Sequence, residues 1–257
     1  MTRPDCLRDD GRTVIIAIDH SLYSWPCPGL EDRKAIIAAA RAAGVDAMIA
    51  SYGTIRDFRA AFGPVKPILK LDLTSVTLGG QYPLTEYVMA YDLGDAERLG
   101  VTTVLNYIQL GAPFELEGLR QSARLAAECD ARGFTYLCEI MPVESAMYPA
   151  PEAPEAIAAA CRTGQELGAH MIKTTMPVPG EGIASAVAAC NIPVVLAGGA
   201  PAKDSRAYDA SIAEALASGI AGVAIGRNAW GASDPAQAMR RFCRLVHATQ
   251  EAGEDAA

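Results

Sequence analysis

A lysine at the end of a short apolar segment is the first candidate for chemistry in this sequence. Lys173 follows Met171 and Ile172 and precedes a turn rich in proline and glycine at 177–182. Burying a charged amine is costly unless the site uses or neutralises it. A neutral lysine amine in a partly apolar site can attack a carbonyl and form a Schiff base, which serves as an electron sink for making or breaking carbon–carbon bonds. The alternative is a lysine at the rim that extends into solvent.

Four further side chains lie at the ends of apolar segments and could assist that amine. Asp19 and Glu139 are candidate acid/base carboxylates. Each also has a structural interpretation, since Asp19 could hold a lysine in a salt bridge and Glu139 could pair with Lys70. Lys70 could instead supply a second cation near the amine or donate to a substrate hydroxyl. Tyr107 ends a segment in the same way and is a further candidate for proton transfer.

Two glycine-containing turns are candidates for binding a phosphate group. Gly198 and Gly199 follow one apolar segment, and Gly226 and Arg227 follow the next. Glycine lets the backbone approach a phosphate closely, and an arginine adds a charge-assisted contact. The alternative is that both are tight turns without a ligand.

These residues would be positioned by a regular alternation of strands and helices. Apolar segments typical of buried parallel strands lie at 14–18, 47–50, 67–71, 103–107, 134–140, 171–173, 193–197 and 222–225. Helices are predicted at 31–43, 54–62, the second half of 84–99, 115–132, 154–167, 182–190, 210–218 and 235–247, and a loop at 75–83.

Eight strand–helix units in about 250 residues predict an α/β fold of the (β/α)₈ barrel type, with an open doubly wound sheet as the alternative. Residues 1–257 are predicted to form one domain, with a short polar segment at 1–12 and a frayed tail at 250–257. The carboxyl ends of barrel strands form the active-site face, and the loops after strands seven and eight are the usual phosphate site. The candidate residues fall at these places.

The composition narrows the range of partners. The chain has 257 residues and a formal net charge of −8, without a basic cluster, so a nucleic-acid partner is not expected. No apolar stretch reaches membrane-spanning length. Seven cysteines without a CxxC spacing favour free thiols and a reducing cytoplasm. Three scattered histidines predict neither a metal site nor any other cofactor; His20 is expected to make a structural hydrogen bond, and His170 and His247 to lie at helix ends or the surface.

Other residues near the predicted active-site face have ordinary structural explanations. Asp72 is expected in a loop or at a helix N-cap. Tyr23 and Trp25 lie in the first loop, where they could cover a pocket or only pack the loop.

Several motifs together resemble one enzyme family. They are Ile18-Asp19-His20, Leu167-Gly168-Ala169 with Ile172-Lys173-Thr174, Pro193-Val194 with Ala197-Gly198-Gly199, Ala221-Gly222-Val223 with Gly226-Arg227-Asn228, and Asp234-Pro235. In this order they resemble the DeoC/FbaB aldolases, in particular the archaeal-type class I fructose-bisphosphate aldolases and the autoinducer-2 thiolase branch. The resemblance implies a TIM barrel, a Schiff base at Lys173, Asp19 beside that lysine, a homo-oligomer, and a phosphorylated small-molecule substrate bound at Gly198, Gly199, Gly226 and Arg227.

The sequence departs from that family at one functional position. Met141 stands where the resemblance implies an acid/base tyrosine, so Glu139, Tyr107, Tyr148 or Lys70 would have to move the proton. We therefore predict a class I, metal-independent aldolase that acts on a ketose phosphate or ketone phosphate, with fructose 1,6-bisphosphate in doubt as its substrate. The alternatives are a lysine-assisted acyltransferase of the thiolase kind and a barrel that binds a phosphorylated ligand without catalysis.

Overall fold

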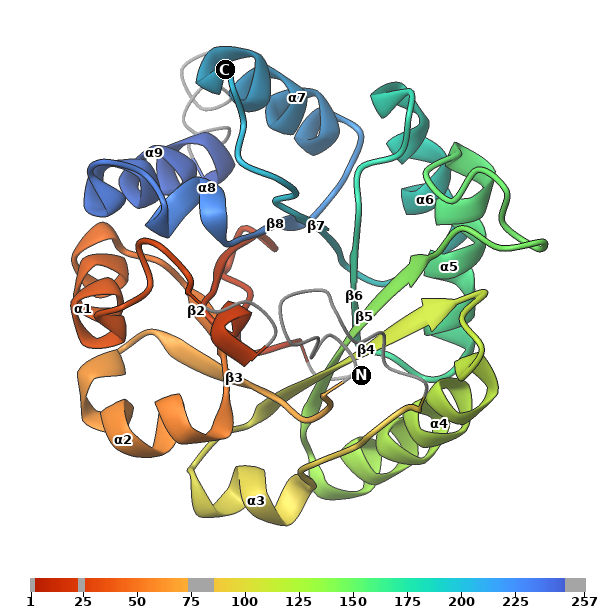
Figure 1. Cartoon of the computed structure of the whole chain (residues 1–257), viewed down its shortest axis with the longest axis horizontal. Coiled ribbons are helices and arrows are strands. Elements are labelled where there is room, and N and C mark those ends of the chain that lie inside the picture. Colours follow the sequence, from red (N-terminus) through yellow and green to blue (C-terminus); the bar gives the residue numbers. More distant parts are fainter. Residues whose placement is uncertain (1–2, 23–25, 74–85, 248–257) are drawn as a thin grey trace.

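The strands of the protein close a parallel barrel. The computed structural model describes residues 3–22, 26–73 and 86–247. Each strand pairs with the next in the chain, and β8 pairs with β1 (Figure 1). The strands are β1 (Thr13–Ala17), β2 (Ala47–Ala50), β3 (Lys66–Lys70), β4 (Thr103–Leu110), β5 (Thr135–Pro142), β6 (Met171–Thr174), β7 (Val194–Ala197) and β8 (Gly222–Ile225). The predicted (β/α)₈ barrel is confirmed, and the open sheet is wrong.

The helices form a ring outside the strands (Figure 1). They are α1 (Arg33–Ala43), α2 (Tyr52–Phe62), α3 (Leu93–Arg98), α4 (Glu115–Arg132), α5 (Pro154–Glu166), α6 (Ile183–Ala189), α7 (Ser205–Ala217), α8 (Arg227–Trp230) and α9 (Pro235–His247), with short 3₁₀ turns at His20–Leu22 and Gly180–Gly182. Capping residues set some of these bounds: the Asp32 side chain accepts from Ala35 N, and Gly44 ends α1 in the left-handed conformation.

Two apolar cores explain why the strand segments are continuous rather than alternating. Side chains inside the barrel, such as Ile15, Ile49, Leu105 and Met171, form one cluster. Side chains on the other face of the same strands form a second and larger cluster with the helices. A parallel strand covered on both faces is apolar at nearly every position.

The structure corrects several predicted boundaries. β4 and β5 are longer than predicted, so Gln109 and Met141 belong to strands. α7 begins at Ser205 rather than at residue 210, because Asp204 caps it by accepting from Arg206 N and Ala207 N. α8 was not predicted. The predicted loop at 75–83, the first-loop aromatics Tyr23 and Trp25 and the tail at 250–257 lie outside the described residues.

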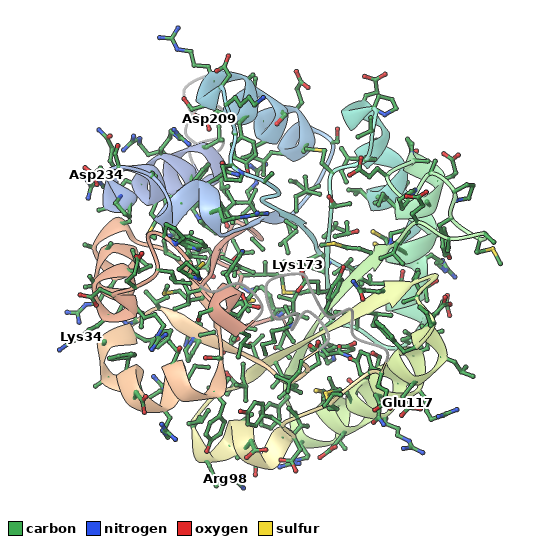
Figure 2. All side chains as sticks on the ribbon, in the orientation of Figure 1. Lys34, Arg98, Glu117, Lys173, Asp209 and Asp234 are labelled. Carbon is green, nitrogen blue, oxygen red and sulfur yellow. The ribbon has the colours of Figure 1, made fainter. Side chains whose placement is uncertain are left out.

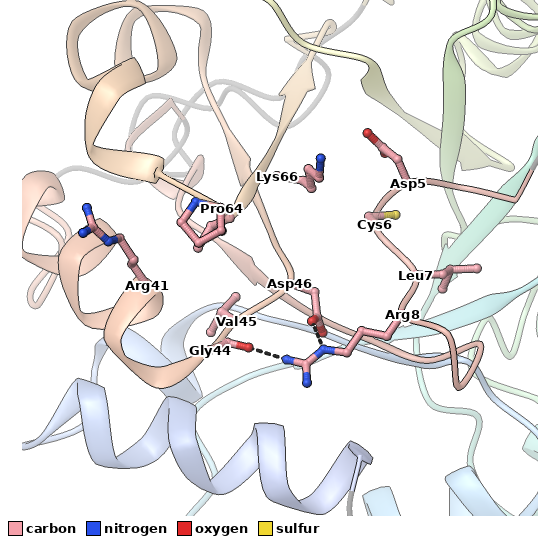
Figure 3. Close-up of a pocket in the computed structure, with 11 residues that line it drawn as sticks. Asp5, Cys6, Leu7, Arg8, Arg41, Gly44, Val45, Asp46, Pro64 and Lys66 are labelled. Carbon is pink, nitrogen blue, oxygen red and sulfur yellow. Dashed lines mark hydrogen bonds and ion pairs between the residues drawn. The ribbon is translucent and has the colours of Figure 1, made fainter.

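Residues 3–12 cover the amino-terminal end of the barrel. Cys6 and Leu7 are buried in the interior cluster, and Asp5 accepts hydrogen bonds from the hydroxyls of Thr102 and Thr103 at 2.6 and 2.7 Å. A pocket of about 320 Å³ lies beside this segment, and Figure 3 shows Arg8 reaching across it to Asp46 and to the carbonyl of Gly44. The segment that the sequence marks only as polar thus closes the barrel.

A charge cluster joins this segment to the last helix. Asp46 pairs with Arg8, and it accepts hydrogen bonds from Val14 N at 2.6 Å and from His247 Nε2 at 2.9 Å. The other ring nitrogen of His247 lies 2.7 Å from Asp10. Because both nitrogens face carboxylates, the doubly protonated ring is favoured. His247 ends a helix as predicted, but it is a bridge between chain segments and not simply a surface residue.

Candidate active site

Lys173 and Glu139 form a contact pair inside the barrel, at the carboxyl-terminal half of β6 and β5. The two residues are partners in the β5–β6 register, and Lys173 Nζ lies 2.6 Å from Glu139 Oε1. Lys173 is 6% exposed and Glu139 9% exposed, so Lys173 is not a rim lysine. Figure 2 shows Lys173 at the centre of the view, with Lys34 and Arg98 at its periphery. The direct partner of Glu139 is thus Lys173 and not Lys70, although the charge of Glu139 also raises the pKa of Lys70.

Lys70 pairs instead with Asp72. The two residues are separated by one position on an extended segment and so share a face, and Lys70 Nζ lies 3.1 and 3.3 Å from the two carboxylate oxygens. Asp72 also accepts from Tyr107 N at 2.9 Å. Burial lowers the pKa of Lys70, but the charges of Asp72, Glu139 and Asp19 outweigh it and raise the pKa to about 12. Lys70 is therefore a fixed cation, and Asp72, expected in a loop or at an N-cap, is its buried partner.

Tyr107 completes a row of side chains with this pair. It is the register partner of Glu139, as Glu139 is of Lys173, so the three lie side by side on β4, β5 and β6. Its ring centroid is 5.8 Å from Lys70 Nζ, and Gln109 Nε2 lies 3.4 Å from its hydroxyl. Burial, with the charge of Glu139, raises the pKa of Tyr107 to about 12, so the phenol stays protonated at neutral pH.

Asp19 lies just beyond β1 and is buried. One of its carboxylate oxygens, Oδ1, is buried and has no hydrogen-bond partner among the described residues. That oxygen is 3.7 Å from His20 Nδ1. In the described part of the chain Asp19 makes no direct ion pair with a lysine, although its charge contributes to the raised pKa of Lys70. Its place beside Lys173, which the resemblance implies, stays a prediction.

His20 fills the space between Asp19 and the turn after β8. A Cβ at Gly226 would lie 2.4 Å from His20 Cε1, so glycine is required there for the ring to fit. Trp230 packs edge-on against the ring at 5.2 Å and donates to Ala17 O at 2.8 Å. The pKa of His20 is lowered to about 4, mainly by burial. The charge of Asp19 raises this pKa, whereas the charges of Lys173, Arg227 and Lys70 lower it further. The neutral ring thus lies within electrostatic reach of all these charged candidates.

The two glycine turns are tied together by hydrogen bonds. Asn228 Nδ2 donates to the carbonyls of Gly198 and Ala200 at 2.8 and 2.9 Å, and Arg227 Nη2 donates to Gly199 O at 3.1 Å. Tyr208 on α7 donates to Gly198 O at 2.9 Å. The positive φ of Gly199, 66°, is one that other residues rarely adopt. The predicted phosphate-binding residues therefore form one unit, which has an arginine at its edge.

Only one of the alternative proton-transfer residues contacts Lys173. Met141 pairs in register with Gln109, two positions beyond Glu139 on β5. The Tyr148 ring lies beside Gly111 in the loop after β4, 3.1 Å from where a Cβ would stand, and burial with the charge of Glu115 raises its pKa. Among Glu139, Tyr107, Tyr148 and Lys70, the described contacts join Glu139 alone to the Lys173 amine.

Two further polar residues, Asn106 on β4 and His170 just before β6, have structural roles. Asn106 faces away from the barrel interior, where its side chain bonds to Tyr87, Ser122 and Tyr136. His170, expected at a helix end or the surface, is buried; it accepts from Tyr136 N at 2.9 Å and contacts Asp130.

The remaining observations concern thiols, metals and membranes. All seven cysteines are buried and free. In residues 3–22, 26–73 and 86–247, no three histidine, cysteine or carboxylate side chains are grouped to hold a metal ion. A search of the same residues finds no helix long and apolar enough to cross a membrane.

Comparison with known proteins identifies the family. The model of the DeoC/LacD family aldolases matches residues 13–232, and the chain belongs to this family. The chain is 26% identical over 245 residues to the 2-amino-4,5-dihydroxy-6-oxo-7-(phosphonooxy)heptanoate synthase of Streptomyces griseus, covering 93% of this chain and 86% of that protein. It is 27% identical over 241 residues to the 2-amino-3,7-dideoxy-D-threo-hept-6-ulosonate synthase 1 of Archaeoglobus fulgidus, covering 93% and 87%.

Solved structures agree with the sequence relatives. An archaeal fructose 1,6-bisphosphate aldolase superposes with a TM-score of 0.84 and 27% identity, covering 94% of this chain and 96% of the other. In a second structure, an archaeal fructose-1,6-bisphosphate aldolase has its catalytic lysine covalently bound to the carbinolamine intermediate. It superposes with a TM-score of 0.83 and 26% identity, covering 93% of this chain and 96% of the other. The prediction of an aldolase on a (β/α)₈ barrel is confirmed. These relatives favour an enzyme over a barrel that only binds ligand.

Proposed function

We propose that the protein is a Schiff-base aldolase in which Lys173 attacks the carbonyl of a ketone phosphate. The observation that carries this proposal is the 2.6 Å contact between Lys173 Nζ and Glu139 Oε1 inside the barrel. A buried amine in contact with one carboxylate can transfer a proton to it and become nucleophilic. Lys70 is a poor alternative, because its raised pKa keeps it cationic.

Glu139 is the acid/base group in this proposal. Attack of the amine on the carbonyl carbon gives a carbinolamine, and Glu139 donates the proton with which the hydroxyl leaves as water. The iminium then loses a proton from the neighbouring carbon to the carboxylate. The resulting enamine adds to the carbonyl carbon of an aldehyde, whose oxygen takes that proton back from Glu139 and becomes a hydroxyl. Hydrolysis of the new iminium returns the amine. The Lys70 cation and the neutral Tyr107 hydroxyl beside Glu139 supply positive potential and a hydrogen-bond donor.

The phosphate of the ketone would bind at the turns after β7 and β8. Gly199 leaves open space where a Cβ would stand and so allows close backbone approach, Gly198 and Gly226 supply the backbone of the two turns beside it, and Arg227 adds the charge. Asp19, whose Oδ1 is buried and has spare acceptor capacity among the described residues, would take a substrate hydroxyl or the carbinolamine hydroxyl.

Trapping with borohydride tests the proposal. The protein is incubated with dihydroxyacetone phosphate, reduced, digested and mapped by mass spectrometry. We expect a stable adduct on Lys173 and none in Lys173→Met. The matched control is Lys34→Met, since Lys34 is an exposed lysine of α1 and that variant should be labelled normally. An adduct on another lysine, or none in the unaltered protein, would overturn the assignment.

The acyltransferase alternative of the thiolase kind can be distinguished from an aldolase by measuring turnover of the same protein. It would need a thiol acceptor such as coenzyme A for turnover, whereas the aldolase needs only an aldehyde. We expect turnover without any thiol.

We also propose that the protein acts in the cytoplasm as a homo-oligomer. Seven free cysteines suit a reducing compartment. Leu116, Met147 and Val178 are large apolar side chains that are 64–75% exposed, as residues of a subunit interface would be in one isolated chain. Light scattering on the purified protein would show a multiple of the chain mass, and a monomer at micromolar concentration would contradict the oligomer.

A further inference from the structure

The turn after β8, one of the two candidate phosphate turns, packs against a histidine ring. A Cβ placed on Gly226 would lie 2.4 Å from His20 Cε1 and 2.7 Å from His20 Nε2, and the next nearest atom is Ala17 O at 3.3 Å. The ring of His20 therefore occupies the space where a side chain of residue 226 would stand. Because glycine brings no side chain of its own to this turn, the ring supplies the packing there.

The same ring packs against the short helix that follows the turn. Trp230 lies edge-on to His20, with the ring centroids 5.2 Å apart, and Trp230 Nε1 donates to Ala17 O at 2.8 Å. Gly226 O accepts hydrogen bonds from the amides of Ala229 and Trp230 at 2.8 and 3.2 Å, so the turn and the indole belong to one helical unit. The end of β1 thus supports this unit through both the histidine ring and a direct hydrogen bond.

Hydrogen bonds extend this support to the turn after β7. Arg227, the residue after Gly226, donates from Nη2 to Gly199 O at 3.1 Å. Asn228 Nδ2 donates to Gly198 O at 2.8 Å. A shift of Gly226 would therefore move both turns of the candidate phosphate site, although the His20 ring packs against the second turn.

The contact of His20 with Asp19 is looser than its contact with Gly226. His20 Nδ1 lies 3.7 Å from Asp19 Oδ1, which is longer than a hydrogen bond. The pKa of His20 is lowered to about 4, mainly by burial, so the ring is neutral near pH 7 and adds no charge to the site. We therefore expect the Cε1–Nε2 edge of the ring to act on the turn by its shape.

From these contacts we infer that His20 is a positioning residue for the phosphate of the substrate: its ring holds Gly226 and Arg227 where that phosphate binds. The inference rests on the proposed function, since it assumes that the ketone reacts at Lys173 and that its phosphate lies on the turns after β7 and β8. A residue that acts through the phosphate site affects a substrate only when the substrate carries the phosphate. Removing the phosphate from the substrate should therefore also remove the effect of His20.

The experiment follows the donor alone, so it needs no aldehyde. Dihydroxyacetone phosphate and dihydroxyacetone are incubated with the protein in deuterated water, and exchange of hydrogen at the hydroxymethyl carbon next to the carbonyl is followed by NMR. This exchange requires the Schiff base and the proton transfer but not the new carbon–carbon bond. The ratio of kcat/KM for the two donors, which we call the phosphate ratio, reports what the phosphate contributes.

Two substitutions distinguish the two edges of the ring. A glutamine side chain reaches the position of His20 Nε2 through the same number of bonds, whereas asparagine reaches only the position of Nδ1. His20→Asn should lower the phosphate ratio by at least about tenfold, because a loosened turn loses about one charge-assisted hydrogen bond to the phosphate. His20→Gln should keep the phosphate ratio within about threefold of the unaltered protein. The control is His247→Gln, a change at a histidine bonded to Asp10 and Asp46 at the other end of the barrel, which should leave the ratio unchanged.

Inorganic phosphate gives a second readout that does not depend on exchange of dihydroxyacetone. Its inhibition constant against dihydroxyacetone phosphate should rise at least about tenfold in His20→Asn and stay within about threefold in His20→Gln. An inhibition constant that is unchanged in His20→Asn contradicts the inference.

Three results of the exchange experiment would also overturn the inference. An equal loss with both donors in His20→Asn would mean that His20 only supports the fold. A larger loss in His20→Gln than in His20→Asn would mean that the ring acts through Asp19, and an unchanged phosphate ratio in both variants would mean that the turn does not need the ring. Failure of the proposed function is distinguishable, because the unaltered protein would then form no borohydride adduct on Lys173 or would exchange both donors equally fast, and the inference would fall with it.

Discussion

The two ends of the barrel hold their buried charges in different ways. At the amino-terminal end, Asp46 is bonded to Arg8, Val14 N and His247, and His247 is also bonded to Asp10. Asp46 lies just before β2, and these partners come from the first segment, β1 and the last helix. The cluster therefore ties distant parts of the chain together, and it offers little spare capacity to a ligand.

At the carboxyl-terminal end the charges are only partly satisfied. Lys173 has one carboxylate partner, Glu139, and Asp19 Oδ1 has no hydrogen-bond partner within the described residues. Lys70 alone is held as firmly as the groups at the other end. The comparison teaches that burial and pairing by themselves do not mark a catalytic charge. What distinguishes the candidate site is an amine and a carboxylate that can exchange a proton, at the same end of the barrel as Asp19 Oδ1, an acceptor without a hydrogen-bond partner among the described residues.

The largest expected effect is that of removing the amine. Lys173→Met should lower kcat by at least about 10⁴-fold, since a covalent nucleophile cannot be replaced by binding alone. The change should leave the fold intact, because a methionine of similar volume replaces a buried side chain. Steady-state rates and circular dichroism check both statements. Activity within tenfold of the unaltered protein would show that the chemistry is not on Lys173.

Next in size is the effect of the carboxylate beside it. Glu139→Gln keeps the shape and the hydrogen bond but removes the proton acceptor, and we expect kcat to fall by about 10²–10⁴-fold. Tyr148→Phe is the matched control, because Tyr148 lies by Gly111 and makes no described contact with Lys173; its kcat should stay within about threefold. If Tyr148→Phe lowers kcat more than Glu139→Gln does, a loop tyrosine rather than Glu139 moves the proton.

The sequence predicts which residues form the candidate site better than it predicts the contacts between them. Strand ends in a barrel share one face, so Lys173, Glu139, Lys70 and the glycine turns could be grouped from the strand order alone. The Lys70–Asp72 pair was also within reach, because residues two apart on a strand point the same way. The position of Asp72 after the apolar run nevertheless favours a loop or a helix N-cap, and the structure corrects this to a buried partner of Lys70.

Other contacts depend on facts that no local pattern contains. Whether Glu139 faces Lys173 or Lys70 is set by the register between strands, which follows from barrel closure. His20 lies against Gly226 because β1 and β8 are neighbours, although more than 200 residues separate them. The cluster around His247 is likewise formed by segments from both ends of the chain and was not predicted.

A change at the amino-terminal end should affect stability and leave catalysis alone. Asp46→Asn leaves Arg8 and His247 without their shared carboxylate, and we expect a loss of about 3 kcal/mol in the free energy of unfolding. Denaturant titration measures the loss, and kcat measured well below the melting temperature should be unchanged. A fall in kcat of tenfold or more would mean that the two ends of the barrel are coupled, and that the amino-terminal cluster is not purely structural.

The smallest effect is a dependence of stability on pH that originates in His247. Burial lowers the pKa of His247, but hydrogen bonds to Asp46 and Asp10 outweigh it, so the pKa lies above its ordinary value of 6.5. A raised pKa means that the stabilisation is complete below pH 6.5 and is lost as the pH rises through the folded-state value. Asp10 titrates in the opposite direction, because burial, which raises its pKa, is outweighed by bonds from His247 and Arg12 N that bring it below 3.8.

The joint contribution of these two groups is therefore greatest between their ordinary values. His247→Gln should cost about 1–2 kcal/mol near pH 5.5, and the difference from the unaltered protein should shrink steadily above neutrality. Melting temperatures from pH 5 to 9 measure it, with Arg244→Gln as the control on the same helix. A difference that stays constant, or grows with pH, would show that His247 is held as a neutral ring and that the amino-terminal cluster is not an ion-pair network.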